Sequence, residues 1–369
     1  MNKGFDSRKD KEKMKKVLIG MSGGVDSSVS ALLLKEKGYE VIGATMKLWE
    51  SDDECVEGGC CNLNSTMDAK RVCDVLNIPH YVLNFKEEFN KCVIQDFISE
   101  YKKCRTPNPC IECNKYMKFG AMYEKAKELG CDYIATGHYA KMEYSDEYGK
   151  YVLRKAKNLS KDQSYVLYNM PKQLLGKVLF PLGDFKSKED VRKIAKEHNL
   201  SVASKPDSED ICFIPDGNYK KFLEQNSSIV PKEGNIVNRK GEILGRHTGL
   251  YNYTIGQRKG LGISYKAPLF VIGFNKERNE VIVGEQQELY RKEMKVNEVN
   301  LLLMDKIERT LDVTVKIRYA SKPAEAIINQ TESGNIQVIF KEPQRGITPG
   351  QSAVFYIGDV VVGGGKIQD

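Results

Sequence analysis

The hydrophobic and polar positions of the first 140 residues follow two alternating patterns. Short apolar runs, typical of strands buried on both faces of a parallel sheet, are separated by longer amphipathic stretches with a helical period. Because strands and helices alternate with short connections, we expect an α/β domain with a parallel, Rossmann-like sheet covered by helices on both faces. The expected strands are residues 16–21, 40–45, 79–83 and 132–136, and the expected helices are residues 28–37, 65–77, 86–103 and 114–129.

The pattern changes after about residue 205, where apolar and polar positions alternate one by one. Such alternation is typical of antiparallel strands that bury one face, and the last part of the chain is expected to form a small β-barrel. Paired strands are expected within 235–244 and 268–284, and single strands at 312–319, 324–329, 336–340 and 353–362. The expected units are therefore a charged extension (1–16), an α/β domain (17–211), a small central domain (212–284) and a C-terminal antiparallel barrel (285–369).

The amino-acid composition indicates the class of protein and the compartment in which it is expected to act. The chain is 41% hydrophobic and 29% charged, which suits a folded protein, and it contains no run of 18 apolar residues that would span a membrane. No apolar stretch precedes Val17, so no signal peptide is expected and the protein is predicted to be cytoplasmic. Its ten cysteines are then expected to be reduced rather than paired in a disulfide framework. The net charge of +7 lies in the extension and the C-terminal half, because residues 17–212 are nearly neutral.

A glycine-rich segment stands between the first expected strand and the first expected helix. Its sequence, at residues 20–28, is Gly-Met-Ser-Gly-Gly-Val-Asp-Ser-Ser. Glycines allow the backbone to approach an anion closely, and a helix N-terminus supplies unpaired N–H donors, so a phosphate site is expected. Ser22, Ser27 and Ser28 add hydroxyl donors, while Asp26 could cap the helix or help to hold magnesium. The segment is not a Walker loop, because it contains no lysine.

Cysteine chemistry is concentrated in two further segments. Cys110 and Cys113 form a C-x-x-C after Thr-Pro-Asn-Pro, at the expected start of a helix whose dipole favours the thiolate form. A zinc site would usually need a second such pair, which the sequence lacks. Cys212 lies in a polar loop before an apolar tripeptide; a lone cysteine is most often a packing residue. The adjacent Cys60 and Cys61 are not assigned a role.

Together these segments resemble the tRNA-specific 2-thiouridylases (the MnmA/TrmU family), which belong to the PP-loop ATP pyrophosphatase superfamily. The resemblance runs from about residue 17 to the C-terminus. Besides the loop and the cysteine segments, it rests on Ala-Thr-Gly-His-Tyr (135–139), Lys-Asp-Gln-Ser-Tyr (161–165), Gly-Gln-Arg-Lys-Gly-Leu-Gly-Ile (256–263) and Thr-Pro-Gly-Gln-Ser-Ala-Val-Phe-Tyr (348–356).

The resemblance implies ATP-dependent 2-thiolation of the wobble uridine of tRNA. The C2 oxygen would be adenylated, sulfur from a cysteine persulfide would replace it, and AMP and pyrophosphate would be released. Cys113 corresponds to the family's nucleophile and Cys212 to its persulfide carrier. Many members have aspartate where this chain has Cys110, and a subset has cysteine there. A 4Fe-4S cluster held by Cys110, Cys113 and Cys212 is therefore an open alternative to the persulfide relay.

The resemblance also implies binding residues and partners. ATP, with Mg²⁺, would contact Gly20, Met21, Ser22, Gly23, Gly24, Val25, Asp26, Ser27, Met46 and Gly137. The target base would contact Asn108, Pro109 and Cys110, and the rest of the tRNA would contact His138, Lys161, Asp162, Gln163, Arg318, Tyr319 and Gln351. For His138, a hydrogen-bonded structural histidine is the alternative. The expected partners of a monomeric enzyme are the tRNA anticodon stem-loop and a persulfide donor, either a cysteine desulfurase or a relay protein.

Other functions are compatible with the same loop. An amidating ligase would use ATP in the same way but would need an ammonia source, and the sequence shows no glutaminase segment. A different tRNA thiolase and a catalytically idle tRNA-binding protein are further alternatives, although the complete loop and the three thiols argue against the idle protein.

Overall fold

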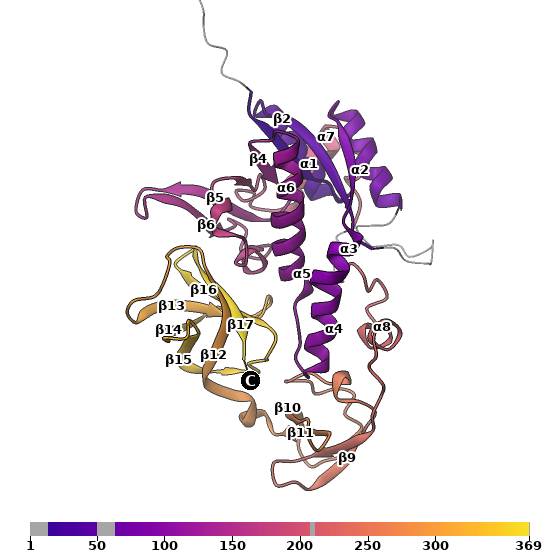
Figure 1. Ribbon diagram of the computed structural model, residues 1–369, viewed down its shortest axis with the longest axis vertical. Helices are drawn as coiled ribbons and strands as arrows, with labels where there is room; N and C mark the ends of the chain where they lie inside the picture. The colour runs from indigo at the N-terminus through magenta and orange to yellow at the C-terminus, as the bar shows by residue number, and fades with distance from the viewer. Residues whose placement is uncertain (1–13, 50–62, 207–210, 369) are drawn as a thin grey trace, which may run out of the picture.

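The structure is a computed structural model that describes residues 14–49, 63–206 and 211–368. Cys60 and Cys61, and all but the last three residues of the expected N-terminal extension, lie outside the described residues. Figure 1 shows three regions: an α/β region that includes α1 and β2, a β-barrel that includes β12 and β17, and a small β region around β9 to β11. No described helix is long and apolar enough to cross a membrane.

The α/β region contains the expected parallel sheet. Its strand order is β3-β2-β1-β4-β7, and all neighbouring pairs are parallel. Alternate residues of β1 pack into different hydrophobic cores: Val17 and Ile19 are part of one core, and Leu18 is part of the other. The strands are β1 (Lys16–Gly20), β2 (Glu40–Lys47), β3 (His80–Asn84), β4 (Tyr133–Ala135) and β7 (Val178–Leu179).

Helices cover both faces of this sheet, as predicted. Residues of α1 (Val25–Glu36), α2 (Leu63–Val75) and α7 (Lys188–Glu197) share the core with Val17. The other face is covered by one continuous helix, which we call the thiol helix, made of α5 (Pro109–Glu112), the π-helical η2 (Cys113–Ala121) and α6 (Met122–Glu128). A second continuous helix consists of α3 (Lys86–Phe89), the π-helical η1 (Asn90–Ile94) and α4 (Gln95–Lys102).

The small β region confirms the two hairpins expected after residue 234. Strands β8 (Gly234–Val237) and β9 (Ile243–His247) form one, and β10 (Phe270–Asn275) and β11 (Glu280–Gly284) form the other. A parallel pairing of β11 with β8 joins them into one sheet. Helix α8 (Tyr219–Asn226) precedes this sheet. Short 3-10 helices are η3 (Ser164–Leu167), η4 (Lys172–Leu174), η5 (Leu250–Asn252) and η6 (Gln286–Leu289).

The C-terminal barrel is closed, because its first strand also pairs with its last. The strands are β12 (Tyr290–Leu301), β13 (Leu311–Lys316), β14 (Ala324–Gln330), β15 (Ile336–Arg345), β16 (Ser352–Ile357) and β17 (Val360–Ile367). The prediction of one strand at 353–362 was wrong. Gly358 has a φ of 60°, which glycine adopts without strain, and the chain reverses there to form two strands.

One hairpin was not expected from the sequence. Strands β5 (Ala140–Ser145) and β6 (Lys150–Lys155) lie between β4 and β7 of the α/β region in the sequence but extend the barrel sheet, where Arg154 pairs with Val360. An ion pair of 2.7 Å between the Arg154 guanidinium and Asp359 supports this junction. The hairpin therefore attaches the barrel to the α/β region through a shared sheet. Figure 1 shows the hairpin between these two regions.

Candidate functional site

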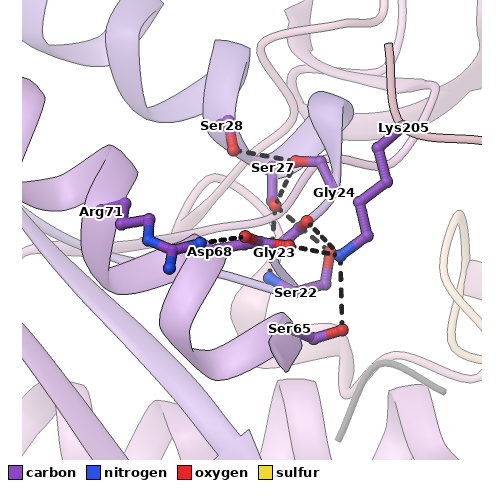
Figure 2. A network of polar contacts seen from close by, with 9 residues as sticks. All are labelled: Ser22, Gly23, Gly24, Ser27, Ser28, Ser65, Asp68, Arg71 and Lys205. Carbon is purple, nitrogen blue, oxygen red and sulfur yellow. Dashed lines mark hydrogen bonds and ion pairs between the residues drawn. The ribbon is translucent and has the colours of Figure 1, made fainter. Parts of the chain in front are cut away.

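The phosphate loop that follows β1 has a backbone conformation that requires glycine. Gly23 has a φ of 69°, and a Cβ atom there would overlap the carbonyl oxygen of Ser65. Gly24 is the N-cap of α1, and the hydroxyls of Ser27 and Ser28 donate to its carbonyl at 3.1 and 2.8 Å. Figure 2 shows these serines folded back onto the loop. The loop is therefore held in place by its own side chains, next to a helix end that favours anions.

The ends of two other strands meet this loop. Gly137, just after β4, is so close that a Cβ atom would lie 2.8 Å from the Ser27 nitrogen. Met46 is the next-to-last residue of β2. The implied ATP-contacting residues thus share the carboxyl edge of the parallel sheet, which is the usual ligand-binding edge of such folds.

Two lysines that sequence reasoning missed reach the loop from distant parts of the chain. The Lys205 ammonium donates to the Gly23 carbonyl at 3.0 Å and to Asp68 at 2.9 Å, as Figure 2 shows. Asp68 also pairs with Arg71 at 3.2 Å. Lys205 lies 182 residues from Gly23, so nothing local in the sequence signals this contact. The phosphate loop contains no lysine, but the fold places Lys205 beside it.

The second lysine, Lys188, forms an ion pair with Asp26. One oxygen of its carboxylate accepts a hydrogen bond of 2.8 Å from the Tyr139 hydroxyl, and the other pairs with Lys188 at 2.7 Å. The expected capping role was wrong, because Gly24 is the N-cap of α1. Each carboxylate oxygen has a second lone pair, so Asp26 could also take part in holding magnesium, with Tyr139 and Lys188 fixing its orientation.

The C-x-x-C starts a helix, as predicted, although the helix begins five residues earlier than expected. The Asn108 side chain accepts a hydrogen bond of 3.1 Å from the Cys110 N–H, and Pro109 occupies the first helical position. Both features favour helix initiation. Cys110 is exposed at this end, whereas Cys113 is only 9% exposed and packs into an apolar cluster.

That cluster, which we call the thiol cluster, also contacts Cys212. Its buried residues include Phe89, Phe97 and Phe213, and Cys212 packs against it from the segment after residue 210. The Phe213 ring lies 5.6 Å from Phe89 and 5.4 Å from Phe97, measured between centroids. The apolar tripeptide after Cys212 thus anchors this cysteine in the core that holds Cys113. Met46, from the nucleotide edge of the sheet, packs against the same cluster.

The three thiols do not form a metal-binding group in this arrangement. Within the described ranges, no three side chains of the His, Cys, Asp and Glu types are placed to hold a metal ion. Cys110 is exposed and Cys113 is buried, which agrees with this finding. This finding concerns a single metal ion; in a 4Fe-4S cluster each thiolate binds a different iron, so the cluster stays an alternative to the persulfide relay.

The barrel holds the segment that leads into the thiol helix. The Gln351 side-chain nitrogen donates to the carbonyl of Thr106 at 2.8 Å, and the Thr106 N–H donates to the carbonyl of Pro349 at 2.9 Å. Gly350 fits between them with a φ of 88° and no room for a Cβ atom. Gln351, implied as a tRNA contact, is thus engaged in positioning the loop before Cys110.

A buried charged group ties the barrel to the same helix. The Lys366 ammonium, from β17, lies 3.1 Å from Asp96, 3.5 Å from Glu298 and 3.8 Å from Glu112. Burial alone would lower the pKa of Lys366, but the three carboxylates raise it, so the lysine stays charged. Burial raises the pKa of Glu112, while Lys366 opposes that shift. Glu112 directly precedes Cys113, so this contact helps to orient the thiol helix.

Several residues that the resemblance implies as tRNA contacts form hydrogen bonds within the protein. Asp162 is buried and accepts hydrogen bonds from the Ala156 N–H at 2.9 Å and the Ser164 hydroxyl at 2.7 Å. The Gln163 side chain accepts one of 2.9 Å from the Tyr139 N–H. Their neighbour Lys161 is exposed, as are Arg318 and Tyr319 on the barrel. The exposed three are therefore the better placed to meet a large ligand.

His138 agrees with the structural alternative. It is buried, with Nδ1 2.7 Å from the Thr136 hydroxyl and Nε2 3.2 Å from the Lys118 ammonium. Because the ammonium can only donate, Nε2 accepts and the ring is neutral. Burial, and then the charge of Lys118, hold the pKa of His138 well below 6.5.

This histidine predicts a pH dependence of stability. Unfolded His138 gains a proton below about pH 6.5, whereas the folded ring resists protonation, so the free energy of unfolding should fall as the pH decreases through that range. His138→Gln should reduce the slope by up to about 1.4 kcal/mol per pH unit, measured by urea unfolding between pH 7.5 and 5.5. His80 and His247, whose pKa values burial also lowers, remain in both proteins as an internal reference. If the unfolding free energy of His138→Gln had the same slope against pH as that of wild type, His138 would not be a buried, neutral ring.

Comparisons with known proteins cover almost the whole chain. A family model described as "tRNA methyl transferase HUP domain" matches residues 15–216, one described as "tRNA methyl transferase PRC-barrel domain" matches residues 220–285, and one described as "Aminomethyltransferase beta-barrel domain" matches residues 291–367. The tRNA-specific 2-thiouridylase MnmA of Acetivibrio thermocellus is 52% identical over 96% of this chain and 99% of its own length. The protein of the same name from Clostridioides difficile is 51% identical over 96% of this chain and 98% of its own length.

A further relative, tRNA-specific 2-thiouridylase MnmA 1 of Thermoanaerobacter pseudethanolicus, is 50% identical over 97% of this chain and 99% of its own length. Identity of this size across all three regions agrees with the loop, the thiol helix and the closed barrel described above. The chain belongs to the tRNA-specific 2-thiouridylase (MnmA/TrmU) family of tRNA sulfurtransferases.

Proposed function

We propose that this protein uses ATP and a cysteine persulfide to convert the C2 oxygen of the wobble uridine of tRNA into sulfur. The observation that carries the proposal is the thiol cluster, because Cys113, Cys212 and Met46 all pack there. Met46 lies at the carboxyl edge of the sheet, where the phosphate loop begins. The expected nucleotide site and the two thiols are therefore close together. The relatives' names supply the substrate, since they are called tRNA-specific 2-thiouridylases.

The chemistry explains why both parts are needed. The C2 carbonyl of uracil is amide-like, and its oxygen is a poor leaving group. Attack of that oxygen on the α-phosphorus of ATP releases pyrophosphate and leaves the oxygen bonded to AMP. The loop and the N-terminus of α1 would hold the phosphates, and Lys205 would add positive charge beside them.

Sulfur transfer would then use the two thiols that pack at the thiol cluster, the buried Cys113 and the partly buried Cys212. The terminal sulfur of a Cys212 persulfide attacks C2 and AMP leaves with the former oxygen. The Cys113 thiolate attacks the Cys212 sulfur, which breaks the persulfide bond, leaves the new sulfur on the uridine and closes a Cys113–Cys212 disulfide. An external thiol must reduce that disulfide before the next turnover. Cys113 lies in the first turns of the thiol helix, whose N-terminus is capped by Asn108, and the dipole at this end of a helix favours a thiolate over a thiol.

The base has to leave its stack to reach this site. A uridine in the anticodon loop is shielded by its neighbours, so it would be turned out toward the end of the thiol helix at Asn108, Pro109 and Cys110, where Cys110 is exposed. A cysteine desulfurase or a relay protein would renew the persulfide, and we propose that the enzyme acts as a monomer. Magnesium, when bound to ATP, would neutralise phosphate charge.

The family descriptions and the names of the relatives point to different group transfers. The matching family models mention methyl transfer, whereas the relatives are named as thiouridylases. Methyl transfer would not require a phosphate loop near the two thiols of the thiol cluster, so the geometry favours thiolation. The names of full-length relatives at 50% identity or more also outweigh the description of a domain.

A direct assay tests the proposal. The protein would be incubated with tRNA, ATP, magnesium, a cysteine desulfurase and cysteine, followed by nucleoside analysis of the digested tRNA. We expect 2-thiouridine together with equal amounts of AMP and pyrophosphate. Absence of 2-thiouridine in every sulfur-delivery format, including protein reconstituted anaerobically with iron and sulfide, would overturn the proposal. Product formed only by the reconstituted protein would replace the persulfide relay with a cluster mechanism.

A further inference from the structure

Lys316, the last residue of β13, lies between two tyrosine rings where the barrel faces the α/β region. Its ammonium is 5.7 Å from the ring centroid of Tyr165 and 5.6 Å from that of Tyr319. The two rings are 6.1 Å apart at an angle of 67°. Tyr165 is fully buried, whereas Tyr319 is 44% exposed. Lys316 therefore lies at the edge of the interface, with an aromatic ring open to solvent beside it.

Within the part of the chain that the structure describes, Lys316 has no hydrogen bond or ion pair. Its side chain is partly buried, and burial lowers its pKa, as does the charge of Lys155. A partly buried ammonium without an acceptor is unusual, because desolvation of a charge is costly unless a partner compensates it. The two tyrosine rings compensate part of this cost, and an anionic ligand could serve as the charge partner of Lys316.

The surrounding charges do not supply that anion. Lys155, at the end of β6, lies over the Tyr356 ring at 4.2 Å and donates to the carbonyl of Gly358 at 3.1 Å. Asp162 acts on both lysines, but its oxygens are held by Ala156 and Ser164. Asp359 also acts on Lys155 and is itself paired with Arg154. Burial lowers the pKa of both lysines and Asp162 raises it, but among the residues that the structure describes Asp162 forms an ion pair with neither lysine.

This positive site borders the thiol helix. The Asn114 side chain, in the thiol helix, donates a hydrogen bond of 2.8 Å to the carbonyl of Val166, which directly follows Tyr165. The pKa of the Tyr319 phenol is raised by burial, then by Asp162 and by Cys110, which agrees with this placement. Cys110 is exposed at the N-terminal end of the thiol helix. An unpaired cation, an exposed aromatic ring and the reactive end of the thiol helix therefore lie side by side.

We propose that Lys316 binds a backbone phosphate of the RNA strand next to the reacting uridine, while the ring of Tyr319 stacks on a flanking base. A lysine is a suitable partner for a phosphodiester, and base–aromatic stacking is a common means of holding single-stranded nucleic acid. Together they would hold the extruded nucleotide in register with Cys110 and the thiol helix. This inference rests on the proposed function, because it takes tRNA as the substrate.

Salt dependence of RNA binding tests the inference. Full-length wild type, Lys316→Met and Lys316→Arg would be titrated with an anticodon stem-loop RNA at several salt concentrations. Removing one phosphate contact should weaken binding about fivefold or more and reduce the slope of log K against log salt by about 0.7. Lys316→Arg should retain the slope. Tyr319→Leu should weaken binding about tenfold without changing the slope, since stacking releases no counterions.

A matched control comes from the same barrel. Lys341 is exposed and pairs with Glu325 at 2.9 Å on the neighbouring strand, so Lys341→Met should change neither affinity nor slope. The slope does not depend on the fraction of folded protein, and a melting curve of each variant checks folding separately. A Lys316→Met slope equal to that of wild type would overturn the inference while leaving thiolation intact. Wild-type protein that binds RNA without salt dependence would instead count against the proposed function.

Discussion

Cys212→Ser is expected to reduce 2-thiouridine formation by at least about 10³-fold, while tRNA affinity changes by less than about threefold. A serine hydroxyl cannot carry a persulfide, so the sulfur that attacks the adenylated uridine would be missing. The substitution itself is small, and Phe213 and Ile214 still anchor the segment in the thiol cluster. Nucleoside analysis under single-turnover conditions and a filter-binding titration measure the two quantities.

Cys92 provides the control for this experiment. It also packs against the thiol cluster and is partly buried, but the proposed chemistry does not use it. Cys92→Ser should therefore form 2-thiouridine at the wild-type rate. Should Cys212→Ser lose affinity for tRNA as strongly as it loses activity, the segment would be structural, and the persulfide role of Cys212 would be abandoned.

Gly23→Ala is expected to destabilise the protein strongly, whereas Gly24→Ala, at the adjacent glycine, is expected to have little effect on stability. At Gly23 an added Cβ would overlap the Ser65 carbonyl, and a φ of 69° is unfavourable for alanine. We expect a loss of more than about 2 kcal/mol in the free energy of unfolding, and ATP binding weakened at least about tenfold as the loop shifts. Urea unfolding and nucleotide titration provide the two measurements.

Gly24→Ala is the matched control, because its Cβ would meet nothing closer than the Ser22 hydroxyl at 3.5 Å and its φ is −103°. The free energy of unfolding should stay within about 0.5 kcal/mol of wild type. Equal destabilisation by both substitutions would mean that the loop does not have the conformation described above.

Local signals in the sequence were sufficient for most of the fold. The apolar runs predicted β1 to β4, and the turn residues between alternating stretches predicted both hairpins of the small β region. Strand β12 was missed because it is highly charged and buries only three of its residues, Met294, Val296 and Leu301. The β5–β6 hairpin was assigned to the α/β region because its barrel partner, Val360, lies more than 200 positions away.

The sequence by itself determined the local chemistry of this protein. The glycines and serines of the phosphate loop, the capped helix that carries Cys110 and Cys113, and the strand and turn patterns all act between near neighbours, so their physical meaning can be derived from their order. The family strings added the identity of the reaction as an expectation, and the comparisons then showed the family itself.

The tertiary structure alone decided which distant groups complete that chemistry. Lys205 reaches the Gly23 carbonyl, Gln351 holds the carbonyl of Thr106, Cys212 packs into the cluster of Cys113, and Lys316 lies beside Tyr165. It also showed that Asp162, Gln163 and His138 form hydrogen bonds within the protein, with partners 2 to 24 residues away in the sequence. The physical reason is that hydrogen bonds, ion pairs and burial depend on distance in space, and chain closure over 100 to 250 residues leaves no local pattern to recognise.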